Sequence, residues 1–219
     1  MELVVCATPE EASRAAARIL AEAGHAGGHL ALSGGSTPRP AYELAAELEP
    51  EWSAAELWWA DERCVSPDDE RSNFRLAREA LRDRLSVPPL AVHRILGELD
   101  PQEGANRYDE ELRGVTLDLV LLGIGADGHT ASLFPHEAAL AEQVRLAVAV
   151  ERVDVARVTL TPPALRGARH VIFLVTGGDK ADAVRRAFAE DPSPATPASL
   201  IRGERTTAVL DRKAAAQLD

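Results

Sequence analysis

The sequence predicts an α/β protein with a mainly parallel sheet that helices cover on both faces. Short apolar runs alternate with segments of helical periodicity from one end of the chain to the other. One run, Leu119–Leu122, is apolar throughout and is bounded by Asp118 and Gly123, as expected for a strand buried on both faces. The 219 residues fit a single catalytic domain, 1–219, and leave room for a small lid.

The first half of the chain alternates apolar runs and capped helices. The apolar runs that we expect to be strands are 3–7, 29–32, 56–60 and 92–96. The predicted helices are 9–23, which Thr8 caps and Gly24 ends, 38–48, which Ser36 and Thr37 cap, 72–85, and 101–113, which Asp100 caps.

The second half repeats this alternation. Beyond Leu119–Leu122, the predicted strands are 145–150, 157–161, 170–176 and 206–210. The predicted helical segments are a helix that Thr130 or Ser132 starts or supports, a weak one at 138–142, a short one ending at Arg166, then 181–189, a turn at 197–202 and a last helix from Asp211.

Composition and charge exclude several classes of function. The net charge of −11 argues against a nucleic-acid partner, because phosphates would be repelled. No apolar stretch is long enough to span a membrane and no basic leader is evident, so we expect a cytoplasmic protein, as a monomer or a small homo-oligomer. Cys6 and Cys64 form neither a disulfide framework nor a paired metal motif, and we expect reduced thiols.

A glycine-rich turn follows the central strand and carries two candidate catalytic side chains. Asp127 and His129 lie just past the carboxyl end of Leu119–Leu122, where open parallel sheets bind their ligands. A carboxylate two residues from an imidazole can support acid–base chemistry. The alternative is that Asp127 only caps the turn and His129 only packs against it.

A second turn, Ser-Gly-Gly-Ser-Thr-Pro at 33–38, has the properties of an anion site. The N–H groups of Gly34 and Gly35 and of a helix start converge there, and the hydroxyls of Ser36 and Thr37 add donors. The spacing is not that of the Walker A loop, so a nucleoside triphosphate is not implied. The same residues would also fit an ordinary strand-to-helix turn.

Charged residues follow two further predicted strands. Asp61, Glu62 and Arg63 come directly after 56–60, and an Arg beside two acids suits recognition of a phosphate or carboxylate. The alternative is a solvated strand terminus. Lys180, one of only two lysines, follows strand 170–176 and could contact a phosphate across the sheet edge.

Four blocks together resemble one family in order and spacing. They are SGGSTP at 33–38, DER at 61–63, GIGADGHTASLFP at 123–135 and VTGGDKA at 175–181, with RVTLT at 157–161 and PASLIR at 197–202 in support. The chain resembles the 6-phosphogluconolactonases over nearly its whole length. The resemblance implies a doubly wound sheet, as in sugar-phosphate isomerases and deaminases, and hydrolysis of 6-phospho-D-glucono-1,5-lactone in the oxidative pentose phosphate pathway.

The resemblance also implies roles for individual residues. Gly34 to Thr37 and Lys180 would hold the 6-phosphate, Asp61, Arg63 and Arg157 would line the pocket, and His129 would be the principal catalytic group. The phosphosugar lactone is then the partner, and neither a metal nor another cofactor is expected. We expect His129 to take a proton from water and return it to the ring oxygen, Asp127 to orient the imidazole, and Arg63 or backbone N–H groups to meet the oxyanion.

Three alternatives are less favoured. A glucosamine-6-phosphate deaminase would resemble this chain up to His129, but it would then carry a Glu where this chain has Phe134. A sugar-phosphate sensor of this fold would need a DNA-binding segment, and no spare segment is evident. A metal hydrolase could use Asp127, His129, His136 and Glu137, but their spacing does not place two ligands on one helix face.

Overall fold

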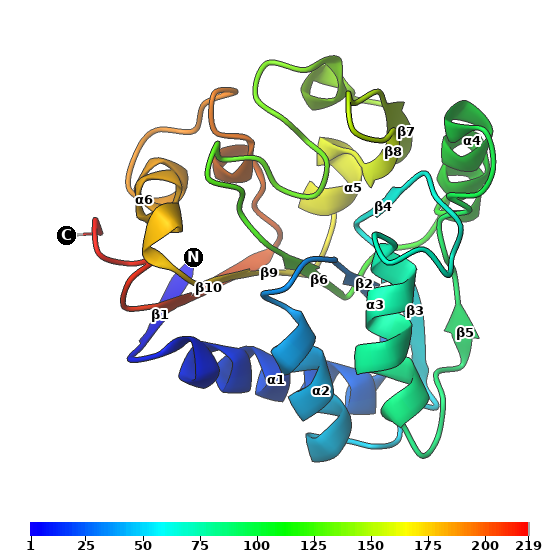
Figure 1. The fold of residues 1–219 in the computed structure, drawn as a ribbon, viewed down its shortest axis with the longest axis horizontal. Coiled ribbons are helices and arrows are strands. Elements are labelled where there is room, and N and C mark those ends of the chain that lie inside the picture. Colours follow the sequence, from blue (N-terminus) through cyan, green and yellow to red (C-terminus); the bar gives the residue numbers. More distant parts are fainter. Residues whose placement is uncertain (219) are drawn as a thin grey trace.

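The computed structural model describes residues 1–218 and contains two sheets (Figure 1). The larger sheet has seven strands in the order β1-β10-β9-β6-β2-β3-β5, and every neighbouring pair is parallel. Its strands are β1 (Glu2–Cys6), β2 (Gly28–Leu32), β3 (Ala55–Trp59), β5 (Ala91–Val92), β6 (Leu119–Leu122), β9 (His170–Val175) and β10 (Arg205–Asp211). The predicted α/β fold with a mainly parallel sheet is confirmed.

The chain winds outward from β2 in two directions. It passes from β2 to β3 and β5 on one side, and then returns to β6, β9 and β10 on the other. The strand order therefore reverses between β2 and β6, which is where doubly wound sheets open a crevice at their carboxyl edge.

Helices cover both faces of the large sheet. They are α1 (Pro9–Ala26), α2 (Arg39–Leu48), α3 (Asn73–Ala80), α4 (Pro101–Glu111), α5 (Pro162–Arg166) and α6 (Ala181–Phe188), with 3₁₀ turns η1 (Arg82–Arg84), η2 (Ala138–Ala141), η3 (Gly178–Lys180) and η4 (Pro197–Leu200). Figure 1 shows α1 and α2 on one side of the sheet and α5 and α6 on the other. The core between these layers is mainly Ala, Leu and Val, and all of β6 is buried.

The second sheet is small, antiparallel and was not predicted. Its strands are β4 (Asp61–Arg63), β8 (Arg157–Leu160) and β7 (Ala147–Val150), in that order. The three charged residues after β3 are therefore a strand of their own and not a solvated terminus. The register places Arg63 directly opposite Arg157.

One end of each of the first two predicted helices differs from the structure. Gly24 does not end the first helix, which continues to Ala26 and closes at Gly27, where φ is +82°. Gly24 is instead a packing position, because an added Cβ would lie 2.2 Å from the Trp52 ring. The second helix begins at Arg39 after Pro38, without the predicted side-chain caps from Ser36 and Thr37.

Two predicted helices are wrong. No helix follows Thr130 and Ser132, because their hydroxyls bond to Gly123 O and to the Asp61 carboxylate instead. No helix starts at Asp211 within the described residues either. Asp211 ends β10, and its carboxylate accepts hydrogen bonds from the N–H groups of Gly177 and Ala214, so the chain continues in turns.

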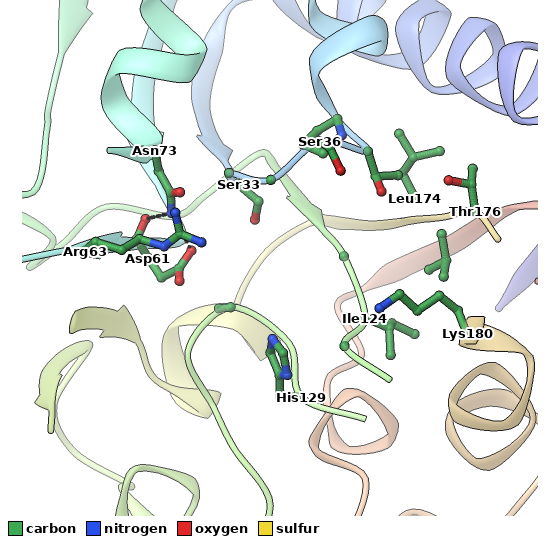
Figure 2. Close-up of a pocket in the computed structure, with 18 of the residues that line it drawn as sticks. Ser33, Ser36, Asp61, Arg63, Asn73, Ile124, His129, Leu174, Thr176 and Lys180 are labelled. Atoms are coloured by element: carbon green, nitrogen blue, oxygen red, sulfur yellow. Dashed lines mark hydrogen bonds between the residues drawn. The ribbon is translucent and has the colours of Figure 1, made fainter. Parts of the chain in front are cut away.

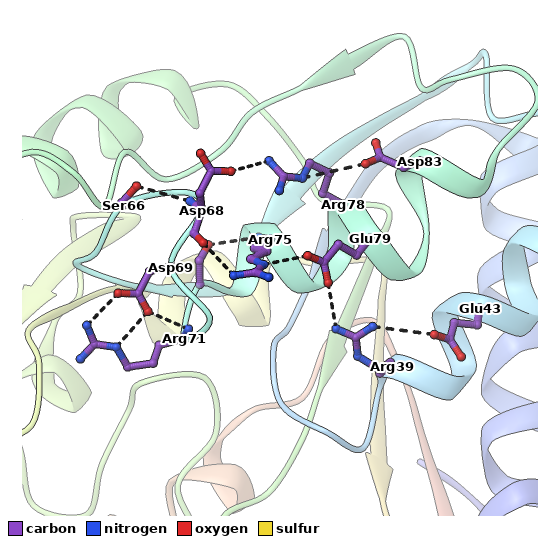
Figure 3. A network of polar contacts seen from close by, with 11 residues as sticks. Arg39, Glu43, Ser66, Asp68, Asp69, Arg71, Arg75, Arg78, Glu79 and Asp83 are labelled. Atoms are coloured by element: carbon purple, nitrogen blue, oxygen red, sulfur yellow. Dashed lines mark hydrogen bonds and ion pairs between the residues drawn. The ribbon is translucent and has the colours of Figure 1, made fainter.

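A network of ion pairs joins α2, α3 and the loop before α3 (Figure 3). Arg39 at the start of α2 lies 3.4 Å from Glu79, which Arg75 also contacts at 2.7 Å. Arg78 then reaches Asp68 in the loop at 2.9 Å. Such exposed pairs each contribute about 0–1 kcal/mol, so the network orients the loop more than it stabilises the fold.

Candidate active site

One cavity of about 520 Å³ opens at the carboxyl ends of β2, β3, β6 and β9. It lies at the reversal of strand order and has the volume of an ordinary small-molecule site. Its lining includes the turn residues Ser33, Gly34, Gly35, Ser36 and Thr37, and the polar side chains of Asp61, Arg63, Asn73, His129, Arg157, Thr176, Asp179 and Lys180. Each binding residue predicted from the sequence is in this lining, as are His129 and Arg63.

Asp127 lies behind His129 and is not part of the lining. Its Oδ1 is 2.6 Å from Nδ1 of His129 and also accepts the His129 backbone N–H at 3.1 Å. Partial burial opposes ionisation, but the backbone N–H and the imidazole outweigh it and lower the pKa of the Asp127 carboxyl. The carboxylate can only accept, so we assign the proton to Nδ1, which leaves the Nε2 lone pair for the cavity.

The glycines of the turn set the position of the imidazole. An added Cβ at Gly125 would lie 2.1 Å from Nδ1 of His129, so no other residue allows this ring position. Gly128 has φ of +93° and packs against Thr196. Figure 2 shows the resulting His129 ring between Lys180 on one side and Asp61 with Arg63 on the other.

Besides Asp127, the imidazole of His129 has the aromatic ring of Phe134 as a neighbour, and not a second carboxylate. The ring centroids of His129 and Phe134 are 4.6 Å apart, and the guanidinium carbon of Arg152 lies 3.9 Å from the Phe134 centroid. Phe134 thus supports the imidazole by packing.

The turn at 33–38 is fixed at its base by buried hydrogen bonds. Ser33 N–H donates to Tyr42 Oη at 3.0 Å, and Tyr42 Oη–H donates back to Ser33 O at 2.7 Å. Beyond this base, Gly35 has φ of +96° and lies in open space. Figure 2 shows Ser36, Thr176 and Lys180 on the same side of the cavity, so this side offers hydroxyl, N–H and ammonium donors together.

The opposite side of the cavity presents two guanidinium groups. Arg63 and Arg157 are cross-strand neighbours in β4 and β8. Arg63 donates from Nη1 to Arg71 O at 2.6 Å, Arg157 donates from Nη2 to Asp154 at 2.8 Å, and the Nε of each is buried without a partner among the described residues. Unpaired buried donors are costly and are often found at functional sites.

Asn73 is a lining residue that the sequence did not reveal. Its Nδ2 donates to Asp61 O at 2.8 Å and to Asp61 Oδ1 at 3.0 Å. Its Oδ1 packs against Gly34, where an added Cβ would lie 1.7 Å away. Asn73 therefore joins the two sides of the cavity. Only its place directly after the Ser72 cap, at the start of a predicted helix, could have drawn attention to it.

Glu62 is a further residue whose role the sequence did not reveal. Glu62 is buried and accepts hydrogen bonds from the N–H groups of Asn73 and Phe74 and from the Ser72 hydroxyl. Burial raises the pKa of the Glu62 carboxyl, and these hydrogen bonds oppose the rise. Glu62 thus fixes the start of α3. Its side chain binds these donors, whereas its neighbours Asp61 and Arg63 line the cavity.

Residues 1–218 lack the features of two other classes of protein. No three His, Cys, Asp or Glu side chains are arranged to hold a metal ion, and this includes the group of Asp127, His129, His136 and Glu137. No helix in this range is long and apolar enough to cross a membrane.

Known proteins resemble the chain in sequence and in fold. A 6-phosphogluconolactonase of Synechocystis sp. is 40% identical over 187 residues, which is 81% of this chain and 77% of that protein. The structure of 6-phosphogluconolactonase from Trypanosoma cruzi superposes with a TM-score of 0.85 at 31% identity, over 99% of this chain and 96% of that one. A monomeric glucosamine-6-phosphate deaminase has a TM-score of 0.88 at 24% identity, over 99% and 100%, and so shares the fold.

One protein-family model matches almost the entire sequence. The family of glucosamine-6-phosphate isomerases/6-phosphogluconolactonase matches residues 3–210. With the relatives and the fold, this match shows that the chain belongs to the glucosamine-6-phosphate isomerase/6-phosphogluconolactonase family.

Proposed function

We propose that the chain hydrolyses 6-phospho-D-glucono-1,5-lactone to 6-phospho-D-gluconate, a step of the oxidative pentose phosphate pathway. The relatives named 6-phosphogluconolactonase support this activity. The observation that carries it is the position of His129, backed by Asp127, in the same cavity as Lys180 and the 33–38 turn. A proton acceptor and a phosphate site then lie within the span of one sugar phosphate.

The two sides of the cavity suggest how the substrate lies. Lys180 and the N–H and hydroxyl groups of Gly34 to Thr37 would bind the 6-phosphate dianion. Arg63, Arg157 and Asp61 would face the lactone ring. In a chain with net charge −11, these cations supply the local positive field that an anionic substrate needs.

His129 would act first as a base and then as an acid. Nε2 takes a proton from water while the water oxygen forms a bond to the lactone carbonyl carbon. When the tetrahedral intermediate collapses, the bond from this carbon to the ring oxygen breaks and the imidazolium returns the proton to that oxygen. The Asp127 carboxylate stabilises the imidazolium between these steps, and no covalent enzyme intermediate is needed.

Arg63 is the better candidate for stabilising the oxyanion. Two N–H groups of the 123–128 turn are already used inside it, because Gly125 N–H donates to His129 O at 2.8 Å and Gly128 N–H donates to Gly125 O at 2.9 Å. The Arg63 guanidinium lines the cavity, and among the described residues its one side-chain hydrogen bond runs from Nη1 to Arg71 O, so Nη2 remains as a donor for the oxyanion.

Phe134 favours lactone hydrolysis over deamination. A phenyl ring beside the imidazole gives it no second ionisable partner of the kind expected in a deaminase. We expect a monomer or a small homo-oligomer. We expect it in the cytoplasm, where a phosphorylated sugar acid is retained.

The test is acid release from freshly generated 6-phosphogluconolactone, measured above the spontaneous rate, with and without a chelator. We expect acceleration that the chelator leaves unchanged. Ammonia release from glucosamine 6-phosphate is the second assay. Ammonia without lactone hydrolysis would replace the proposed activity with deamination, and neither product would leave a non-catalytic sugar-phosphate sensor as the better proposal.

A further inference from the structure

Arg186 of α6 contacts the back of the turn that carries Asp127 and His129, although it is not part of the cavity lining. Its Nη2 lies 3.3 Å from Ala126 O, and its Nη1 lies 3.5 Å from Asp127 O. The first carbonyl group directly precedes Asp127, and the second belongs to Asp127 itself. A side chain distant in sequence thus donates to the backbone of the turn from outside.

Stronger contacts fix the guanidinium itself. Nη1 donates to Thr196 Oγ1 at 2.7 Å and, at 3.4 Å, to Ala195 O, while Nε donates to Asp182 Oδ2 at 2.9 Å. Asp182 is one turn earlier on α6, and Thr196 is buried in the connection between α6 and β10. Every nitrogen of Arg186 is therefore engaged, and the group joins α6, this connection and the turn.

The turn and this connection are also in direct contact. Ala198 N–H donates to Gly128 O at 3.0 Å. An added Cβ at Gly128 would lie 2.9 Å from Thr196 Cγ2 and 3.2 Å from Nη1 of Arg186. Arg186 and Thr196 together thus form the surface on which Gly128 rests.

The turn needs support of this kind. It belongs to no helix or strand, and Gly128 within it has φ of +93°. Ala131, two residues after His129, has φ of +48°, a strained conformation for a non-glycine residue. With no regular backbone ladder of its own, the turn depends for its position on contacts such as those from Arg186.

We propose that Arg186 is a positioning residue for hydrolysis, which holds the 125–129 turn so that Nε2 of His129 stays aligned with the bound lactone. This proposal rests on the proposed role of His129 as the base. Arg186 does not touch substrate, so its loss should reduce turnover and leave the phosphate contacts of Lys180 intact. A misplacement of about 1 Å can cost on the order of 100-fold in rate.

The experiment compares Arg186→Ala with Arg185→Ala. Arg185 is the adjacent residue of the same helix and pairs with Asp182 and Glu190 at the surface, which makes it the matched control. We expect Arg186→Ala to lower kcat by about 10- to 100-fold with KM within about twofold, and Arg185→Ala to stay within about twofold in both. Arg186→Lys, which keeps a cation and fewer donors, should recover part of the loss.

A second readout does not depend on turnover. In protein with ¹⁵N-labelled histidine, the Nδ1–H of His129 that donates to Asp127 should give a downfield proton resonance, assigned by its loss in His129→Asn. We expect this resonance to be weakened or lost in Arg186→Ala and kept in Arg185→Ala. If the wild-type protein fails to hydrolyse the lactone, the proposed function falls while this measurement still tests the contact.

Thr196→Val covers the case in which Arg186→Ala does not fold. It removes the 2.7 Å acceptor of Arg186 but keeps the shape of the side chain, so a smaller loss of kcat with unchanged KM is expected. The proposal is overturned if Arg186→Ala keeps both kcat and the His129 resonance. It is also overturned if Arg186→Ala changes kcat and KM together, and if Arg185→Ala changes both constants to the same extent as Arg186→Ala.

Discussion

Ser132 Oγ donates a 2.6 Å hydrogen bond to Oδ2 of Asp61 across 71 positions of sequence. Both side chains are buried, and the other oxygen of Asp61 accepts from Asn73. This contact ties the loop that follows His129 to the strand that carries Arg63. The turn that carries Asp127 and His129 is therefore joined to the small sheet as one structural unit.

Ser132→Ala should destabilise the fold by about 1–3 kcal/mol, because it leaves a buried carboxylate oxygen without its donor. It should also lower kcat, since the loop after His129 loses its attachment. Urea unfolding followed by circular dichroism measures the first effect. Ser66→Ala, at an exposed loop position, is the control and should stay within about 0.5 kcal/mol of wild type. Equal stability of the two variants would contradict the proposed importance of this bond.

We expect His129→Ala to affect mainly kcat and Lys180→Ala to affect mainly KM. Loss of the base should lower kcat by roughly 10²- to 10⁴-fold while product binding is retained. Loss of the ammonium group should chiefly raise KM, because it removes a contact to the phosphate. Lys213→Ala is the control, since it removes the other lysine of the chain. Steady-state kinetics and product titration decide, and the reverse pattern would refute both roles.

Asp127→Asn should lower kcat by roughly 10-fold or more, because an oriented general base is itself worth 10²- to 10⁴-fold. The Asp127 carboxylate accepts from both Nδ1 and the backbone N–H of His129 and lies outside the cavity lining, so its loss should leave KM nearly unchanged. Steady-state kinetics of the variant measure both constants. A kcat close to that of wild type would mean that Asp127 acts only on the backbone of the turn.

Gly125→Ala should abolish most turnover, because the added Cβ would lie 2.1 Å from the imidazole and displace it. KM should change less than kcat, since the substitution leaves the side chains of Lys180, Ser36 and Thr37 in place. Gly178→Ala is the matched glycine control, where the added Cβ meets only Lys213 Cβ at 3.9 Å. Crystal structures of both variants would report the ring position directly.

Glu62→Ala should destabilise the fold by about 3 kcal/mol, because it removes the acceptor of several donors at the start of α3. The folded pKa of Glu62 is raised above its unfolded value, so this group contributes less stability as pH rises from the unfolded to the folded pKa. Subtracting the pH dependence of Glu62→Gln from that of wild type isolates this term. Exposed Glu70→Ala should change neither quantity.

The sequence could predict the edge at which the site forms. Parallel strands end on the same side, so blocks that follow β2, β3, β6 and β9 had to meet, and His129, Arg63 and Lys180 do line one cavity. Close glycine spacing also marked the turn around Gly125. These features depend on local pattern and on one topological rule.

Long-range pairing could not be predicted in the same way. Asp61 forms a strand because β8 returns alongside it, and nothing within the triplet itself announces that partner. The hydroxyls of Thr130 and Ser132 resemble helix caps in sequence, but they bond to residues brought close by the fold. Asn73 and Arg186 are polar residues on short helices that carry several other polar side chains. Nothing in the hydrophobic periodicity therefore distinguishes these two, which make inward contacts, from the rest.

The reversal of strand order between β2 and β6 has a consequence for how substrate preference can change. The chain leaves these neighbouring strands in opposite directions, so the two walls of the crevice are separate connections with separate lengths. An insertion in one connection can narrow or widen the opening without shifting a single backbone pair of the sheet. Enzymes with this scaffold can therefore adapt to longer or shorter phosphosugars through loop length alone, while the frame beneath stays constant.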